Sequence, residues 1–336
     1  MFFFDVSKNW VILAPAVCRT AAARDIAATI ALLRERAGLT AAEPPILDME
    51  DTAPANAAEI LLNCDDDSVK NSFAWRAGAE RIEIYGHAPR SFDFAVFDFL
   101  AALGVDFTEY DHIRLPAAAQ HGRYPLAKKS EYTHHTSSQY PILCIDARHS
   151  YNEAYKLIKW AGRTQICEIA ISLKPALNEK ALAKLYHLAK SYHLEVARGG
   201  FELSLLMPRY LFIIDHDLFR MEEGKRRNDV NFCASNHKTQ ELIKRNAEHF
   251  FSRCRGTKRF YLLNEQPHSW CSCPACRAFS FEEQNLMAVC AAASVLAGID
   301  SEAEIFYTGK LEEGQTLRPR TNMIALESAA GSILHY

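Results

Sequence analysis

Residues 141–171, PILCIDARHSYNEAYKLIKWAGRTQICEIAI, predict a strand, a helix and a second strand. The apolar run at the start of this segment ends at Asp146, and Ser150 with Glu153 has the spacing of a helix capping box. The following helix carries one apolar stripe, formed by Ala154, Leu157, Ile158 and Ala161. One strand-and-helix unit of this kind suggests that others follow it along the chain.

Four further apolar runs, separated by helical patterns or loops, lie at residues 194–197, 259–263, 303–307 and 322–326. Uninterrupted apolar strands that alternate with helices are typical of a parallel sheet buried on both faces. No glycine-rich phosphate-binding motif follows any of these strands, which disfavours a nucleotide-binding doubly wound sheet. The predicted fold is α/β, with a (β/α)8 TIM-barrel-type domain that ends after about six of the eight strands. We expect a fragment of a longer barrel.

Residues before this segment predict a smaller α/β domain. Strands are expected at 10–13, 60–62, 73–76 and 81–85, and helices at 20–37 and from about 91 to Gly104. A polar stretch with no apolar period separates this part from the barrel. The predicted organisation is an N-terminal domain over 1–120, a linker over 121–139 and the barrel domain over 140–336.

Composition excludes several classes of protein. The chain is 49% hydrophobic and 24% charged, as soluble globular proteins are. A net charge of -3 with scattered basic residues argues against a nucleic-acid partner. No signal peptide or membrane-spanning stretch is visible, so we expect a cytoplasmic protein without a membrane partner. The unpaired edges of an incomplete sheet could be covered in a homo-oligomer.

Polar residues at the carboxyl ends of the predicted strands suggest where chemistry takes place, because active sites of barrels form there. We expect Glu265 to be a general acid and Glu327 or Glu202 to be its carboxylate partner, the pair that glycoside hydrolysis requires. A carboxylate in such a place is also often a helix cap or an arginine partner. The residues expected to bind a carbohydrate substrate are Asp146, Arg148, Asn264 and the ring walls Trp270 and Tyr307. No cofactor is required.

A cysteine cluster, Cys271, Cys273 and Cys276, allows two other interpretations. A zinc site needs a fourth ligand from elsewhere, such as His268, Cys254 or Cys233. A thiol redox pair needs a helix N-terminus to lower a thiol pKa. We favour packed thiols around Trp270, with no metal.

Three motifs resemble a bacterial family, domain of unknown function 4838, which is related to α-glucuronidases and β-hexosaminidases. The motifs are Gly199-Gly200-x-Glu202-Leu203-Ser204-Leu205-Leu206-Met207-Pro208-Arg209, Asn231-Phe232-Cys233-Ala234-Ser235-Asn236 and Trp270-Cys271-x-Cys273-x-x-Cys276-Arg277. Residues 7–15, 86–90 and 96–100 look like the cap domain of α-glucuronidases.

The resemblance implies a glycosidase-like barrel that acts on a glycoside or uronide, with the acid at Glu265. The chain departs from the family pattern at Phe201, Gln266 and Thr308, where histidine, aspartate and histidine are common. These changes remove polar groups, so a catalytically inactive sugar-binding or scaffold barrel is the alternative function.

Overall fold

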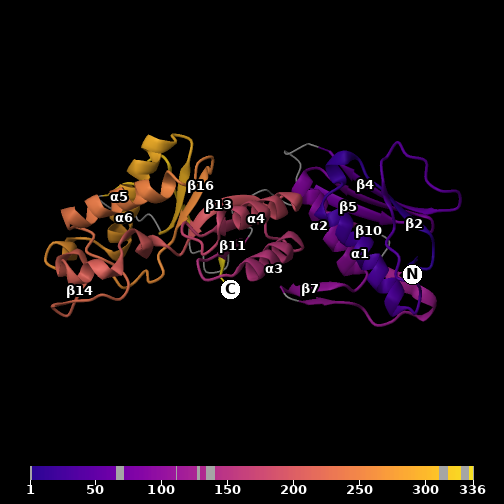
Figure 1. Cartoon of the computed structure of the whole chain (residues 1–336), viewed down its shortest axis with the longest axis horizontal. Helices are drawn as coiled ribbons and strands as arrows, with labels where there is room; N and C mark the ends of the chain where they lie inside the picture. The colour runs from indigo at the N-terminus through magenta and orange to yellow at the C-terminus, as the bar shows by residue number, and fades with distance from the viewer. Residues whose placement is uncertain are drawn as a thin grey trace. The chain divides into compact units, whose positions relative to one another are not determined.

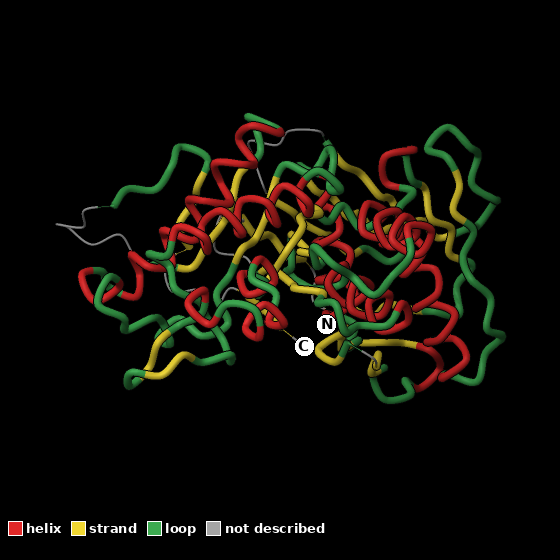
Figure 2. The backbone as a smooth tube through the Cα atoms, turned by 60° about the vertical axis from the view of Figure 1, so that its left-hand side comes forward, coloured by secondary structure: helices red, strands yellow, loops and turns green. Residues whose placement is uncertain are grey.

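The computed structural model describes residues 2–65, 72–110, 112–126, 129–133, 141–309, 317–326 and 333–335. The chain forms two compact units. The first unit combines Met1–Tyr140 with Tyr151–Cys167 and Glu179–Glu195, and the second combines Pro141–Ser150, Glu168–Asn178 and Val196–Tyr336. In Figure 2, helices are drawn in red and strands in yellow. Among the described residues, no helix combines the length and apolar character that crossing a membrane requires.

A six-stranded sheet of order β10-β5-β6-β4-β2-β3 forms the centre of the first unit. Its strands are β2 (Trp10–Leu13), β3 (Ile46–Leu47), β4 (Ala58–Cys64), β5 (Ser72–Ala77), β6 (Arg81–Gly86) and β10 (Lys129–Thr133). Strands β3, β2, β4 and β6 run parallel, whereas β5 is antiparallel to both β6 and β10. The predicted turn at Gly78 is confirmed, because its N–H donates to the carbonyl oxygen of Arg81 at 2.8 Å.

Four α-helices belong to the first unit: α1 (Ala21–Arg36), α2 (Pro89–Ala102), α3 (Tyr151–Gly162) and α4 (Glu179–Ser191). Helix α1 buries the predicted stripe of Ile26, Ile30 and Leu33. The remaining elements are β1 (Phe2–Asp5), β7 (Asp106–Glu109), β8 (His112–Arg114), β9 (Arg123–Leu126) and the 3-10 helices η1 (Ala16–Cys18) and η2 (Gln120–Gly122).

The segment expected to be a linker supplies strands β9 and β10, which pair with β1 and β5. Tyr124 and Leu126 are buried while Arg123 and Pro125 are exposed, so β9 has the alternation of a half-buried strand. Four residues of alternation are too few to stand out in a polar stretch. The structure therefore places ordered strands where the sequence pattern indicated a connection.

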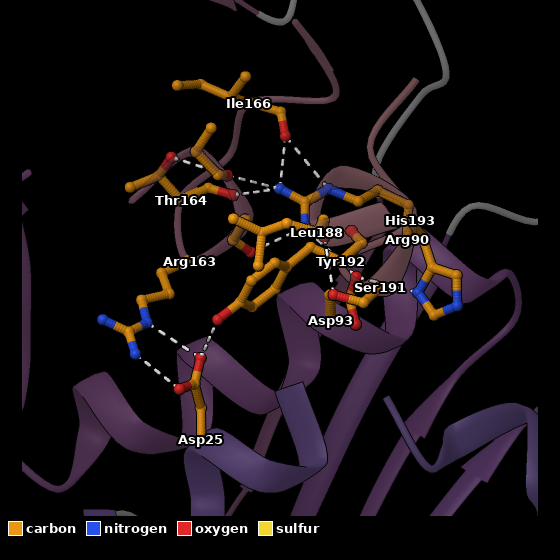
Figure 3. Close-up of polar contacts among 12 residues, drawn as sticks. Asp25, Arg90, Asp93, Arg163, Thr164, Ile166, Leu188, Ser191, Tyr192 and His193 are labelled. Atoms are coloured by element: carbon orange, nitrogen blue, oxygen red, sulfur yellow. Dashed lines mark hydrogen bonds and ion pairs between the residues drawn. The ribbon is translucent and has the colours of Figure 1, made fainter. Parts of the chain in front are cut away.

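Arg90, at the start of α2, binds the carboxyl end of α3 (Figure 3). Its guanidinium donates to the carbonyl oxygens of Gly162 at 2.8 Å and Thr164 at 2.8 Å, and also to that of Ile166. The last carbonyl groups of a helix have no hydrogen-bond partner within the helix. A cation there supplies donors for them and interacts favourably with the negative end of the helix dipole. These bonds link α2 to the chain that follows α3.

Asp25 of α1 makes a second set of links in the first unit (Figure 3). It accepts hydrogen bonds from Arg163 at 2.6 and 2.9 Å and from the hydroxyl of Tyr192 at 2.7 Å. Buried polar groups with matched partners of this kind fix the packing of α1 against residues from beyond both α3 and α4.

The second unit is built on a seven-stranded sheet of order β18-β17-β16-β13-β12-β11-β19. Its strands are β11 (Ile142–Ile145), β12 (Glu168–Ile171), β13 (Glu195–Gly200), β16 (Arg259–Leu262), β17 (Glu304–Thr308), β18 (Met323–Leu326) and β19 (Ile333–His335). The pairings of β11 with β12 and β19, β13 with β16, β16 with β17 and β17 with β18 are parallel. The six predicted strands are present, and β19 adds a seventh beside β11.

Helices α5 (His237–Phe251) and α6 (Phe281–Ile299) pack against each other in this unit (Figure 1). The predicted capping box at the start of α6 is confirmed, with Ser280 and Glu283 bonded reciprocally. Its other elements are the hairpin β14 (Met221–Glu222) and β15 (Lys225–Arg226), and the 3-10 helices η3 (Leu203–Leu206), η4 (Arg209–Ile213), η5 (His216–Leu218) and η6 (Cys276–Ala278).

Candidate functional site

A pocket of about 640 Å³ lies in the second unit at the carboxyl ends of β11, β13 and β16. This is the end of a parallel sheet at which barrel-type proteins build their active sites. Four residues predicted from the sequence line it, namely Asp146, Arg148, Glu202 and Glu265. The other lining residues are Cys144, Ala147, Gly199, Gly200, Phe201, Ser204 and Leu205.

Gly199 and Gly200 form part of the pocket wall, and the backbone is crowded at Gly199. Gly199 has φ +103°, and a Cβ added to it would lie 2.1 Å from the carbonyl oxygen of Tyr261. Gly200 has φ +146°. A side chain at Gly199 would therefore meet the neighbouring strand β16, which explains a glycine at this position.

Glu202 is a partly buried carboxylate held by two donors. It accepts hydrogen bonds from the hydroxyl of Ser172 and, at 2.7 Å, from the backbone N–H of Leu173. Burial raises its pKa above the usual value, although the two hydrogen bonds and the nearby Arg198 act in the opposite direction. A carboxyl with a raised pKa in a pocket is a candidate for proton transfer.

Glu265 is exposed and follows β16. The hydroxyl of Ser204 donates to Glu265 Oε1 at 3.4 Å. The preceding residue, Asn264, is only 4% exposed, and its Oδ1 accepts from the backbone N–H of Gln266 at 2.8 Å. Asn264 therefore shapes the turn that presents Glu265, and it does not line the pocket.

Asp146 and Arg148 form an ion pair at the pocket, with 2.6 Å between Arg148 Nη2 and Asp146 Oδ2. Burial alone would raise the pKa of Asp146, but the hydrogen bonds from the Arg148 side chain and backbone outweigh it and the pKa is lowered. His149 Nδ1 lies 3.1 Å from the other carboxylate oxygen. Asp146 is therefore ionised at neutral pH and orients Arg148.

Trp270 and Tyr307 do not line this pocket. They are 3% and 2% exposed and belong to the hydrophobic core of the second unit. Trp270 packs edge-on against Phe232, with 5.4 Å between ring centroids. Both rings that the sequence suggested as sugar-binding walls are therefore packed in the core. Among the described residues, the aromatic side chain that lines the pocket is Phe201. Glu327 lies outside the described residues.

The sequence did not point to Ser172 or Cys144. Ser172 directly follows β12, so the strand-end rule that found the carboxylates could also have found it. Cys144 lies on β11, where burial raises the pKa of its thiol to about 12. It is therefore a neutral thiol at physiological pH and not an activated nucleophile.

Among the described residues, one group of side chains that could hold a metal ion lies outside this pocket. The Sγ atoms of Cys233, Cys271, Cys273 and Cys276 lie within 4.8 Å of one another, and none of these cysteines lines the pocket. Three of them are the cysteines of the predicted cluster, and Cys233 is one of the residues considered as a fourth ligand.

No family model and no curated protein matches this chain. The chain is, however, similar to solved structures of glycoside hydrolases. A GH20 β-N-acetylhexosaminidase from Streptomyces coelicolor matches 96% of the chain with a TM-score of 0.59 and 11% identity, over 66% of that protein. A Flavobacterium johnsoniae chitobiase matches 96% of the chain with a TM-score of 0.58 and 11% identity, over 52% of that protein.

A GH20 exo-β-N-acetylglucosaminidase from Vibrio harveyi matches 96% of the chain with a TM-score of 0.56 and 10% identity, over 54% of that protein. The chain thus spans between 52% and 66% of the length of these three proteins. The predicted barrel-type α/β fold is confirmed. The likeness to domain of unknown function 4838 has no matching family model.

Proposed function

We propose that this chain carries the active site of a glycoside hydrolase, with Glu265 as general acid and Glu202 as its carboxylate partner. The observation that carries the proposal is that both carboxyl groups line one pocket at the carboxyl end of a parallel sheet. The fold that the chain shares with GH20 hydrolases supports it. Hydrolysis of an O-glycosidic bond needs an acid for the leaving oxygen and a second carboxylate on the other side of the bond.

The two roles follow from the surroundings of each carboxyl group. Glu265 is exposed, so it can reach a leaving group that extends out of the pocket. Glu202 is fixed through both oxygens, by Ser172 and by the N–H of Leu173, so its carboxylate is held in one orientation. Glu202 therefore suits attack on the sugar or activation of water.

The substrate class is a carbohydrate, and the pocket volume lies within the usual range for small-molecule sites. Arg148 is the one basic side chain among the described residues that line it. Arg148 binds Asp146 through Nε and Nη2, and its exposed guanidinium has further N–H groups that can donate to a carboxylate on the substrate, so a uronide is our finer proposal.

The test uses leaving groups of different quality. Wild type is screened on aryl glycosides, including N-acetylglucosaminides and glucuronides, and the best sugar is then prepared as an aryl and as an alkyl glycoside. Loss of a general acid or base costs about 10²- to 10⁴-fold in rate. We expect Glu265→Gln to lose far more activity on the alkyl glycoside, whose leaving group needs the proton, and Glu202→Gln to lose activity on both.

Glu248→Gln provides the matched control, because Glu248 is an exposed glutamate of α5 that does not line the pocket. It should keep wild-type turnover. The proposal fails if Glu265→Gln turns over both glycosides as wild type does, or if wild type cleaves no glycoside in the screen.

The second candidate function is a non-catalytic sugar-binding barrel, and Phe201 in the pocket wall favours it. An apolar ring offers a stacking face for a sugar but no proton. Calorimetric titration that detects sugar binding to wild type, without any product, would support this candidate over hydrolysis.

A further inference from the structure

Four cysteines of the second unit bring their sulfur atoms to one place. Cys271, Cys273 and Cys276 lie in the loop between β16 and α6, and Cys233 lies in the segment before α5. Cys233 Sγ is 3.7 Å from Cys273 Sγ and 3.7 Å from Cys276 Sγ, and all four Sγ atoms lie within 4.8 Å of one another. Each of the four side chains is buried, with at most 6% exposed.

These sulfur separations distinguish between possible links. A disulfide would bring two sulfurs to about 2.05 Å. Four thiolates at about 2.3 Å from one tetrahedral zinc ion lie about 3.8 Å from each other. An iron–sulfur cluster would hold its thiolates farther apart, because several iron atoms lie between them. We propose that Cys233, Cys271, Cys273 and Cys276 bind one structural zinc ion.

Donors around the sulfurs support this assignment. The backbone N–H of Met221 donates to Cys271 Sγ at 3.2 Å, and Arg226 Nη1 lies 3.8 Å from the same atom. Ser235 Oγ is 2.9 Å from Cys276 Sγ. Four thiolates and one Zn²⁺ carry a net charge of about -2, which N–H donors and a guanidinium offset.

The site is closed and therefore structural. Four protein ligands fill the tetrahedral coordination of zinc and leave no position for water or substrate. Gln284 of α6 clamps Cys271, accepting from its N–H and donating to its carbonyl oxygen, both at 3.1 Å. Zinc would therefore join the cysteine loop, the segment before α5 and the hairpin β14–β15, which supplies Met221 and Arg226.

The position of the cluster connects it to the loop that follows Glu265. Asn231, two residues before Cys233, donates to the carbonyl oxygens of Gln266 and Ser269, both at 2.8 Å. Zinc would hold Cys233 and Cys271 together and so keep Asn231 against this loop. We expect zinc loss to loosen the loop, whatever reaction the pocket carries out.

The experiment measures metal content in the full chain, purified under reducing conditions without chelators or an affinity tag that binds metal. We expect inductively coupled plasma mass spectrometry to find about one zinc per chain, as a single four-cysteine site requires. Cys276→Ser should retain less than a tenth of that zinc. Cys290→Ser is the control, because Cys290 lies on α6 outside the cluster, and it should keep all of it.

Cobalt substitution gives a readout that does not depend on the variant. Wild type grown with cobalt should show intense thiolate-to-cobalt absorption of a tetrahedral site, even if Cys276→Ser does not fold. Neither readout requires hydrolysis, so an inactive protein with one zinc would refute only the proposed function. As a further check, zinc-free wild type is refolded with zinc and treated with an alkylating reagent. Alkylation at all four cysteines would overturn the site. A disulfide among the four, or iron in place of zinc, would overturn it as well.

Discussion

At the residue scale, the pocket depends on what surrounds each carboxyl group. Asp146 and Glu202 follow β11 and β13 at the same edge of one sheet, yet their pKa values move in opposite directions. Hydrogen bonds from the side chain and backbone of Arg148, together with nearby positive charge, outweigh burial at Asp146, whereas burial outweighs the donors at Glu202. Environment, and not residue type, therefore separates a charge that positions a cation from a carboxyl that can exchange a proton.

Ser172→Ala should change the pH dependence of hydrolysis in a defined direction. The Ser172 hydroxyl favours the ionised form of Glu202, so its loss raises the pKa of Glu202 further. Glu202 must be ionised to act as base or nucleophile. The acidic limb of the kcat/KM profile should therefore move to higher pH, with activity recovered at alkaline pH. Ser204→Ala, which removes the contact to Glu265, is the comparison. An unmoved acidic limb would contradict this role of Glu202.

The sequence predicted which residues line the pocket where their position at a strand end was enough to decide it. Asp146, Arg148, Glu202 and Glu265 all line the pocket, since the carboxyl ends of parallel strands meet at one edge. The predicted roles of Trp270 and Tyr307 depended on which way a ring turns, and that is set by packing against Phe232 and other distant residues that no local pattern contains.

At the element scale, the close pairing of β13 with β16 restricts which residue can occupy position 199. Gly199→Ala places a methyl group 2.1 Å from the carbonyl oxygen of Tyr261, at φ +103°. We expect a loss of more than about 2 kcal/mol in the free energy of unfolding, since overpacking adds to backbone strain. Gly256→Ala is the control, with φ +82° and nothing within 4 Å, and should cost only about 1 kcal/mol. Urea unfolding compares the two, and equal losses would mean that the close contact relaxes freely.

The elements themselves could be predicted where the apolar period is long. In helix α1 and in strands β11 and β12, most of the buried positions are apolar positions of the sequence. Strand β9 could not be found, because its alternation is four residues long and its partner, β1, lies at the other end of the unit's sequence. Pairing between distant segments decides such strands.

At the scale of the whole molecule, the chain divides differently from its sequence pattern. Helices α3 and α4 follow strands of the second unit in sequence, yet they cluster with the first unit. The reason lies in polar contacts that a periodicity argument does not contain, made by Arg90 and Asp25 with residues 161–166 and 192 (Figure 3). The boundary between the compact units therefore separates β11 from α3 and β12 from α4, whereas α5 and α6 stay in the same unit as the strands before them.

Arg90→Met tests whether these contacts join the first unit together. The change keeps an unbranched chain but leaves the carbonyl oxygens of Gly162 and Thr164 without their cation. Breaking a buried charged hydrogen-bond network costs about 3 kcal/mol, which lowers Tm by about 6 to 12 °C for a unit of this size. Hydrogen exchange should rise at the end of α3 and in residues 163–166. Arg114→Met removes an exposed ion pair with Glu109 and should lower Tm by less than about 2 °C. Unchanged exchange near α3 in Arg90→Met would mean that apolar packing alone holds α3 in the first unit.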